Sequence, residues 1–208
     1  MVKKLKEGIL IVFEGIDGCG KTTQAKLLFE KLKSLGFDTI LLKEPSSSKW
    51  GKEIKRLSLF ENSITPEKEL KLFIKDREEN TNKNIKPALR EKKIVILDRY
   101  YFSTIAYQGA KGIDIDLIKK LNKNIAIEPD IVFILDIEPN IGLERIENRK
   151  KKEKLFEQEN YLNRVREIYN SLKGKNIFKI DGSKKIDEIR KEIEKIVFNY
   201  INPFLNNN

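Results

Sequence analysis

Residues 15–23, GIDGCGKTT, combine the residue types that bind phosphate groups. The glycines allow a tight turn in which successive backbone N–H groups point inward at phosphate oxygens. The Lys21 side chain can reach the outer phosphates of a nucleotide, and the Thr22 hydroxyl can bind the accompanying Mg²⁺. We therefore predict a nucleoside triphosphate site built from the whole loop: Gly15, Ile16, Asp17, Gly18, Cys19, Gly20, Lys21, Thr22 and Thr23.

The flanking residues supply the elements that must position this loop. Residues 9–13, ILIVF, have the length and the β-branched content of a buried strand. After the loop, apolar residues recur at spacings of three and four from Ala25 to Leu35, which predicts a helix with one buried face that ends near Gly36. The order strand, glycine-rich loop, helix is the context that makes the phosphate motif specific.

Further apolar runs, DTILL, KIVILD, DIVFILDI and NIFKID, alternate with helical patterns along the chain. This alternation predicts an α/β protein with a three-layer P-loop NTPase fold, in which a roughly five-stranded parallel sheet carries helices on both faces. The triphosphate then lies beyond the carboxyl ends of the strands. We expect one domain over residues 1–208, with a frayed tail at 202–208.

Asp98 and Arg99 come directly at the end of the run KIVILD. A carboxylate at this position can hold Mg²⁺, directly or through water, together with Thr22. The alternative is an ordinary aspartate in a turn after a strand. Arg99 can bind a second phosphate group with two parallel hydrogen bonds. We predict Thr22 and Asp98 as metal ligands and Arg99 as a phosphate-binding residue.

Residues 144–157 combine helical periodicity at both ends with a middle that has no apolar residue between Ile146 and Leu155. One interpretation is a solvated hairpin tip. The other is a short lid that closes over the nucleotide and supplies a positive charge to the transferring phosphoryl group. Both can hold for different residues of the segment.

The composition limits the class of protein. The chain has 208 residues, of which 42 are basic and 32 acidic, giving a net charge of +10. Because the two signs alternate, as in KKIDEIRKEIEK, they favour solvated helix faces over a nucleic-acid surface. No apolar run approaches the ~20 residues of a membrane span, so we expect a cytoplasmic protein. With no histidine and only Cys19, internal disulfides and histidine bases are excluded, which fits phosphoryl transfer.

An ordered set of motifs over residues 9–196 resembles the thymidylate kinase family of P-loop nucleoside monophosphate kinases: FEGIDGCGKTT, KEP, LFIKDREEN, LDRYYFSTIAYQG, EPDIVFILDIEP and EQENY. The resemblance implies transfer of the γ-phosphoryl group of ATP to the 5′-phosphate of dTMP, which gives dTDP and ADP for dTTP synthesis. It also implies Mg²⁺ as cofactor and a homodimer.

For the acceptor, the resemblance implies that Phe73 stacks on the thymine ring and Arg77 hydrogen-bonds its carbonyl edge. Thr104 would lie near the base N3–H, Tyr107 against the sugar where a 2′-hydroxyl would clash, and Arg99 on the acceptor phosphate. It further implies a group of residues around these positions: Asp17 on the side of the 3′-hydroxyl, Glu14, Gln108 and Glu159.

For the donor, the resemblance implies that Arg145 binds ATP. It implies the same for Asp181, which lies in the DGS sequence after the last strand. Arg149 is our first choice for the lid residue that supplies the transition-state charge, with Arg145 or Lys154 as alternatives. The implied catalytic set is Lys21, Arg99, Arg149 and Asp17.

One stretch and one single position depart from the sequences of many relatives. The chain reads KEPSSSKWG where they read Arg-Glu-Pro-Gly-Gly, so Lys43 replaces an arginine beside the acceptor phosphate. Gly18 stands where some relatives have arginine, which moves the expected transition-state charge to the lid. The preference for dTMP over another monophosphate is therefore the open part of the prediction.

Other classes fit less well. A regulatory GTPase needs an N/T-K-x-D motif, and neither copy of NKNI ends in aspartate. A nucleic-acid-stimulated ATPase would place a glutamate beside Asp98, where this chain has Arg99. A kinase for a different monophosphate such as dUMP stays open, because only the residues of the base pocket argue against it.

Overall fold

The structure is a computed structural model and describes residues 3, 5–59, 64–146 and 152–205, with the backbone alone for residue 146 and residues 152–157. One five-stranded parallel sheet runs through it in the order β2-β3-β1-β4-β5. The strands are β1 (Ile9–Glu14), β2 (Thr39–Lys43), β3 (Ile94–Asp98), β4 (Ile131–Asp136) and β5 (Ile177–Asp181). The predicted α/β fold with a parallel sheet is confirmed, and every strand begins and ends within one residue of the apolar run that predicts it.

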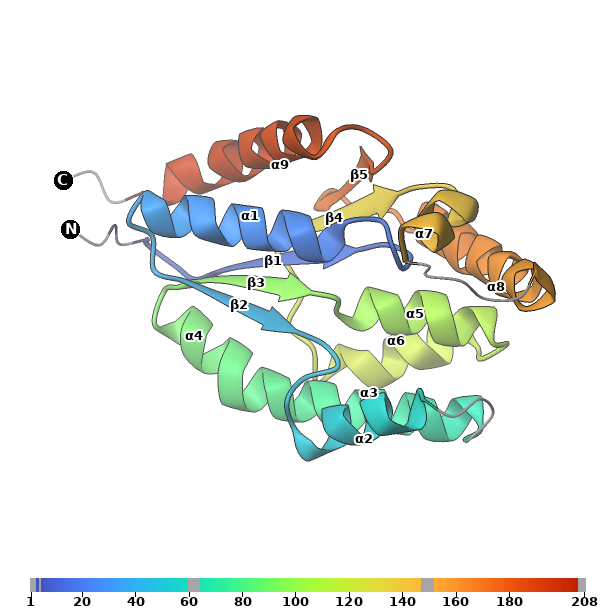
Figure 1. Cartoon of the computed structure of the whole chain (residues 1–208). Helices are drawn as coiled ribbons and strands as arrows, with labels where there is room; N and C mark the ends of the chain where they lie inside the picture. Colours follow the sequence, from blue (N-terminus) through green and yellow to red (C-terminus); the bar gives the residue numbers. More distant parts are fainter. Residues whose placement is uncertain (1–2, 4, 60–63, 147–151, 206–208) are drawn as a thin grey trace.

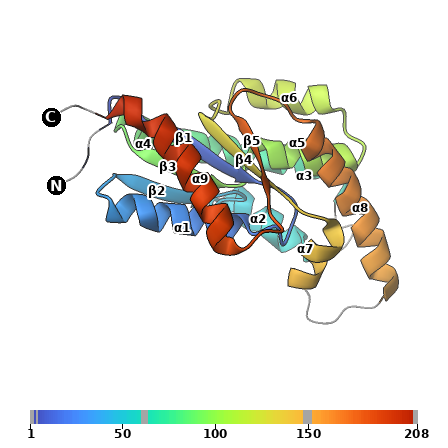
Figure 2. The same ribbon diagram turned by 90° about the horizontal axis from the view of Figure 1, so that it is seen from above.

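Helices cover both faces of this sheet, as Figures 1 and 2 show. α1 and α9 lie on one face, while α4, α5 and α8 lie on the other and α3 and α6 pack beside α5. The helices are α1 (Lys21–Ser34), α2 (Lys49–Leu57), α3 (Pro66–Asn80), α4 (Lys86–Arg90), α5 (Tyr101–Ala110), α6 (Ile115–Lys123), α7 (Pro139–Ile146), α8 (Lys152–Ser171) and α9 (Ile186–Ile201). A π-helical turn, η1 (Thr81–Ile85), joins α3 to α4.

The core is formed where the strands meet these helices. β1 and β3 are buried along their whole length, which explains why their sequences are continuous apolar runs rather than alternating ones. Burying each of these large aliphatic side chains contributes about 1.5–3 kcal/mol, so the central strands hold the site edge rigidly.

The register of the strands brings three loops to one edge of the sheet. Phe13 of β1 and Lys43 of β2 both pair with Asp98 at the end of β3. Because the strands end level and all point to the right in Figure 1, the loops after β1, β2 and β3 leave the same edge of the sheet. The phosphate loop, the KEP sequence and Arg99 therefore share one edge.

The expectation of a frayed tail is wrong for residues 202–205. Asn202–Phe204 form η2, a turn of 3-10 helix, and the Lys6 backbone N–H donates to the Phe204 carbonyl at 2.9 Å. Leu205 also pairs with the buried Leu5 in an isolated β-bridge. The first residues of the chain thus hold the tail, a contact that no local pattern predicts.

No helix in the part of the chain that the structure describes combines the length and the apolar character needed to cross a membrane.

Candidate active site

The loop between β1 and α1 folds around the Lys21 ammonium group. Lys21 Nζ donates to the Ile16 carbonyl at 2.9 Å and lies 3.9 Å from the Asp17 carboxylate. Burial lowers the pKa of Lys21, and the negative charge of the neighbouring side chains only partly offsets this effect. The side chain is folded onto its own loop, from which it can extend to a phosphate.

Gly18 shows why this loop needs glycine. Its φ angle is +79°, a left-handed conformation that other residues rarely adopt. A Cβ at this position would also lie 2.2 Å from the Gly142 carbonyl oxygen of α7. The chain therefore has no room for a side chain at residue 18, where some relatives carry arginine.

Thr22 and Asp98 meet at the mouth of the loop. Thr22 Oγ1 donates to Asp98 Oδ2 at 2.6 Å, and Lys43 Nζ lies 3.2 Å from the same oxygen. Asp98 Oδ1 is buried without a hydrogen-bond partner among the described residues. A buried carboxylate oxygen that lacks a partner, next to a hydroxyl, offers the hard oxygen ligands that Mg²⁺ prefers. The two residues predicted as metal ligands are thus in contact and fit the ion.

A cavity of about 430 Å³ opens on one side of the phosphate loop. Arg145 covers part of it and donates from NH1 to the carbonyls of Gly18 and Gly182, at 3.4 and 3.2 Å. We call this cavity the donor groove. Its lining residues are Gly18, Cys19, Gly20, Lys21, Thr22, Thr23, Gln24, Arg145, Gly182, Lys184, Ile186 and Ile189.

Most of the residues predicted for ATP line the donor groove, but not all of them. Gly15, Ile16 and Asp17 belong to the loop without lining the groove. Asp181 points away, since its carboxylate accepts from the Ser183 backbone N–H and hydroxyl at 2.9 and 2.5 Å. The residues after it, Gly182 and Lys184, line the groove instead.

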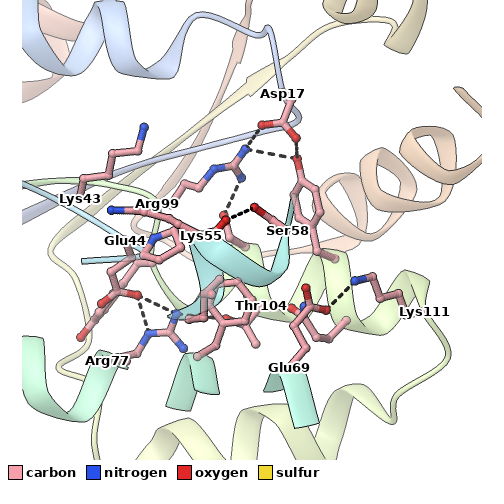
Figure 3. A pocket seen from close by; sticks show the side chains of 17 residues that line it. Asp17, Lys43, Glu44, Lys55, Ser58, Glu69, Arg77, Arg99, Thr104 and Lys111 are labelled. Carbon is pink, nitrogen blue, oxygen red and sulfur yellow. Dashed lines mark hydrogen bonds and ion pairs between the residues drawn. The ribbon is translucent and has the colours of Figure 1, made fainter. Parts of the chain in front are cut away.

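A second cavity, of about 390 Å³, opens on the other side of the loop, and Figure 3 shows it closely. We call it the acceptor cavity. It brings together every residue predicted for the acceptor except Glu14 and Glu159. Its lining residues are Asp17, Lys43, Glu44, Pro45, Ile54, Lys55, Ser58, Glu69, Phe73, Arg77, Arg99, Tyr100, Ser103, Thr104, Tyr107, Gln108 and Lys111.

Arg77 is held at the bottom of the acceptor cavity by a buried network (Figure 3). Its Nε and NH2 donate to Glu44 Oε2 at 2.9 and 2.7 Å, and NH2 also donates to the Thr104 hydroxyl at 3.0 Å. NH1 donates to Asn122 Oδ1 at 2.7 Å. A guanidinium has one more N–H than these bonds use, which leaves a donor on NH1 for a ligand. Burial raises the pKa of Glu44, although the adjacent Arg77 opposes this.

Arg99 stands at the boundary between the cavity and the phosphate loop. Its backbone has a φ angle of +74°, which is uncommon for a residue with a side chain and frequent at functional sites. NH2 donates to Asp17 and to the Tyr107 hydroxyl, and NH1 to the Ser103 hydroxyl at 3.0 Å. Partial burial raises the pKa of Asp17, but the charges of Arg99 and Lys21 outweigh it, so the pKa lies below its usual value.

Glu14 lies behind Arg99 and does not line the acceptor cavity. It is fully buried, and its Oε1 accepts from the backbone N–H groups of Tyr100 and Ser103 at 2.7 and 3.2 Å. Its Oε2 accepts from the hydroxyls of Ser103 and Tyr169 at 2.6 and 2.9 Å. Glu14 therefore caps the start of α5 from a distant strand. The prediction of direct acceptor contact does not match this position.

Lysines and an acidic residue on the rim of the acceptor cavity were missed by sequence reasoning. Lys55 of α2 donates to the Ser46 carbonyl at 3.1 Å, and Lys111 pairs with Glu69 at 2.5 Å. Together with Lys43, these ammonium groups add positive charge around the cavity. In a chain in which 36% of the residues are charged, no sequence signal separates them from ordinary surface lysines.

Residues 144–157, predicted as a lid, lie partly outside the described residues. Arg149 lies outside the described residues, as does the side chain of Lys154. Arg145 lies in the last turn of α7, beside the donor groove. Glu159 lies on α8 and does not line the acceptor cavity.

Comparisons with known proteins point to one family. A family model for thymidylate kinase matches residues 13–193. A probable thymidylate kinase from Archaeoglobus fulgidus is 44% identical over 200 residues, which cover 96% of this chain and all of the relative. A thymidylate kinase from Leptospira interrogans is 40% identical over 195 residues, or 93% of this chain and 95% of the relative. The crystal structure of thymidylate kinase from Ehrlichia chaffeensis aligns with a TM-score of 0.74 at 34% identity, covering 91% of this chain and 98% of that one.

Proposed function

Because the chain belongs to the thymidylate kinase family and is thus a phosphotransferase, we propose that it transfers the γ-phosphoryl group of ATP to the 5′-phosphate of dTMP, giving dTDP and ADP. The family resemblance argues for this reaction in the synthesis of dTTP. The roles of individual residues rest on the arrangement of the two cavities.

The observation that carries the proposal is the position of Asp17 between the donor groove and the acceptor cavity. On one side its carboxylate lies 3.9 Å from Lys21 Nζ, which lines the donor groove. On the other side it accepts from Arg99, which lines the acceptor cavity. A cation for each of two phosphate groups therefore lies on either side of one carboxylate, which suits a direct transfer between two bound nucleotides.

The reaction needs no protein base. The 5′-phosphate of dTMP is largely a dianion at neutral pH, since its second pKa is about 6. One of its oxygens attacks the γ-phosphorus of ATP, a new P–O bond forms, and the bond to the β,γ-bridging oxygen breaks so that ADP leaves. The cost of the step is the repulsion between two anions, which cations must offset.

Lys21 and Arg99 are the described residues that we propose for this task. Lys21 would leave the Ile16 carbonyl and bind the β- and γ-phosphates. Arg99, held by Asp17, Tyr107 and Ser103, would bind the acceptor phosphate with its planar fork. Arg149, on the proposed lid at residues 144–157, would add positive charge as the lid closes. The closed lid would exclude the water that otherwise hydrolyses ATP.

Thr22 and Asp98 would hold Mg²⁺ bound with ATP. When bound, this ion neutralises charge on the β- and γ-phosphates as a Lewis acid. The buried Asp98 oxygen that lacks a hydrogen-bond partner supports this assignment among the described residues. Lys43 Nζ, 3.2 Å from Asp98, would set the carboxylate in place.

We propose that the base of dTMP enters the acceptor cavity between Phe73 and the polar groups of α5. Phe73 would stack on the ring, and the remaining N–H of Arg77 would donate to a base carbonyl. Tyr107, whose hydroxyl donates to Asp17 at 2.9 Å, would lie against the sugar and leave little space for a 2′-hydroxyl. Asp17 would approach the 3′-hydroxyl.

We also propose a homodimer acting in the cytoplasm, as the family resemblance implies. Leu117 and Leu121, one turn apart on α6, are 46% and 40% exposed and offer an apolar contact. Light scattering would test this: a dimer mass that falls to the monomer mass in Leu117→Glu supports the proposal, and a monomer in the wild type contradicts it.

The experiment that tests the activity is chromatographic measurement of dTDP and ADP formed from Mg·ATP with dTMP, dUMP, dCMP, UMP or no acceptor. We expect dTMP to be the best acceptor, dUMP weaker and UMP nearly inactive. Lys21→Met serves as the control against contaminating kinases. A preference for another acceptor would overturn the substrate, and ADP release without any acceptor, raised by DNA or RNA, would overturn the kinase reaction.

A further inference from the structure

The polar wall of the acceptor cavity contains a buried amide with one end unused. Gln108 of α5 is 2% exposed and lines the cavity. Its Nε2 donates to Glu69 Oε2 at 3.0 Å. Its Oε1 is buried and has no hydrogen-bond partner among the described residues. A buried acceptor without a partner is destabilising, so the position favours a ligand that donates a hydrogen bond.

Glu69 decides which end of this amide is free. The ionised carboxylate can only accept hydrogen bonds, so the amide of Gln108 must turn its NH₂ group towards it. The opposite orientation would place the Gln108 oxygen against a carboxylate oxygen, where the lone pairs repel. Glu69 in turn is held by Lys111 Nζ at 2.5 Å, a contact that Figure 3 shows at the rim of the cavity. The charge on Glu69 therefore holds the NH₂ group of Gln108 and leaves Oε1, on a residue that lines the cavity, as the free acceptor.

The other polar groups of this wall are donors. Arg77 has one N–H left on NH1 after its bonds to Glu44, Thr104 and Asn122. Thr104 Oγ1 accepts from Arg77 at 3.0 Å, so its own proton can donate elsewhere. The wall thus offers donors from Arg77 and Thr104 together with one acceptor from Gln108.

This pattern matches one class of base edge. Thymine and uracil present two carbonyl acceptors on either side of the N3–H donor. Cytosine presents an unprotonated N3, whose lone pair would face the Gln108 oxygen. A site built to accept a hydrogen bond discriminates strongly against an analogue that lacks the donor, because its own buried group then stays unpaired.

We propose that Glu69 is a positioning residue that sets base selectivity: by fixing the amide of Gln108 as an acceptor, it makes the acceptor cavity select bases with N3–H over cytosine. Glu69 acts through Gln108 and does not need to touch the nucleotide. The proposal rests on the proposed function, since it assumes that a nucleotide base occupies this cavity.

The test compares kcat/KM for dTMP and dCMP in a protein that keeps Glu69 and in Glu69→Gln, an isosteric change that removes the charge. Because Lys111 Nζ and Gln108 Nε2 bind the same oxygen of Glu69, both proteins in this comparison also carry Lys111→Met, which removes the ammonium group that would hold the amide oxygen in place. The neutral amide can then donate to Gln108 Oε1, so Gln108 is free to turn its NH₂ group to the cavity. We expect the ratio of kcat/KM for dTMP to that for dCMP to fall about 10-fold or more. The change should lie mainly in the KM values, because binding of the base is altered and the reacting phosphates are not.

Glu78→Gln is the matched control, since Glu78 is an exposed glutamate on the same helix, α3. It should leave the ratio unchanged. A second pair of variants tests whether Glu69 acts through Gln108. In a Gln108→Leu background, which removes the amide, Glu69→Gln should change the ratio of kcat/KM values no further. Cooperative thermal unfolding and calorimetric titration with dTMP would show that each variant is folded.

An unchanged ratio in a folded Glu69→Gln variant would overturn the proposal, as would an equal loss of kcat for both nucleotides. The same effect of Glu69→Gln with and without Gln108 would also overturn it. Failure of the proposed function is a different result, because the wild-type protein would then form no dTDP at all.

Discussion

The acceptor cavity and the donor groove lie on two sides of one loop, yet they are built differently. Side chains from the loop after β2, from α3 and from α5 hold one another in the acceptor cavity, where Arg77 is 1% exposed and bonded to the buried carboxylate of Glu44. The donor groove is lined mainly by the consecutive residues 18–24 and by residues after β5. There Arg145 bonds only backbone carbonyls, among the hydrogen bonds of the described residues.

This difference indicates where specificity resides. Backbone N–H groups and a helix N-terminus bind the phosphates of any nucleotide, so the donor groove needs few fixed side chains. A base and a sugar must be distinguished by side chains whose hydrogen-bond directions are set before binding. We infer that the acceptor cavity is pre-organised and that the donor groove is completed by the nucleotide.

The largest effect expected from this difference is on stability. Arg77→Met would leave Glu44 buried without its charge partner, and loss of one member of a buried pair costs about 3–5 kcal/mol. Arg145→Met is the matched change in the donor groove, and because Arg145 is exposed we expect its effect to stay within about 0.5 kcal/mol. Urea unfolding of both variants measures the contrast. Equal losses of unfolding free energy in the two variants would show that Arg77 and Arg145 contribute equally to stability, which contradicts the contrast.

The next effect concerns the phosphate of the acceptor. Arg99→Lys keeps a positive charge but loses the planar fork that bonds Asp17, Tyr107 and Ser103. We expect kcat/KM for dTMP to fall about 100-fold, which corresponds to the loss of two charge-assisted hydrogen bonds. ATP binding, measured by calorimetry without acceptor, should be unchanged. A parallel loss of ATP affinity would place Arg99 in the donor site.

A smaller effect is expected in the donor groove. Arg145→Met removes a side chain that covers the groove but leaves the phosphate loop intact. We expect the KM for ATP to rise about 5-fold. This corresponds to the loss of one contact of about 1 kcal/mol between the Arg145 guanidinium and ATP, either a cation–π contact with the adenine ring or a hydrogen bond. The dissociation constant of dTMP should stay the same. A change in dTMP binding instead would assign Arg145 to the acceptor.

The smallest effect is a pH dependence of stability from Glu14. Burial raises the pKa of Glu14 despite its hydrogen bonds to Ser103, Tyr169 and Tyr100. Above the ordinary glutamate pKa of about 4.3, the unfolded chain releases this proton while the folded protein retains it up to the raised pKa. The contribution of Glu14 to the free energy of unfolding therefore falls as pH rises through this interval.

In Glu14→Gln this titration is absent. Subtracting the two curves of unfolding free energy against pH, measured by urea titration, should show the wild type losing stability relative to the variant as pH rises. Glu7→Gln, a change at an exposed glutamate, serves as the control and should follow the wild type. A wild type that gains stability relative to Glu14→Gln would mean that the carboxylate titrates below its ordinary pKa.

The sequence predicts the backbone elements that form the phosphate-binding part of the site, because they are local in the chain. The phosphate loop, its strand and its helix are contiguous, and Asp98 is placed against Thr22 by two strands that pair in register. Asp98, Arg99 and most residues of α5 belong to one contiguous motif, LDRYYFSTIAYQG, which predicts them together. These features need only short-range patterns and the rule that parallel strands end at one edge.

The rest depends on packing between distant segments. Glu14 could face either the cavity or the helix behind it, and the unsatisfied N–H groups at the start of α5 decide in favour of the helix. Asp181 turns to Ser183, so its neighbours line the groove. Glu69 meets Gln108 only because α3 packs on α5, and nothing local marks it among the other acidic residues.

The most direct test of pre-organisation is the dissociation constant of dTMP, measured by calorimetry with and without a non-hydrolysable ATP analogue and Mg²⁺. If the acceptor cavity is formed in advance, dTMP should bind the donor-free protein, and the analogue should change its dissociation constant by less than about 5-fold, the lower end of typical coupling between sites. If dTMP shows no binding at about 1 mM until the analogue is present, the cavity is assembled by the donor, and the contrast between the two sites is contradicted.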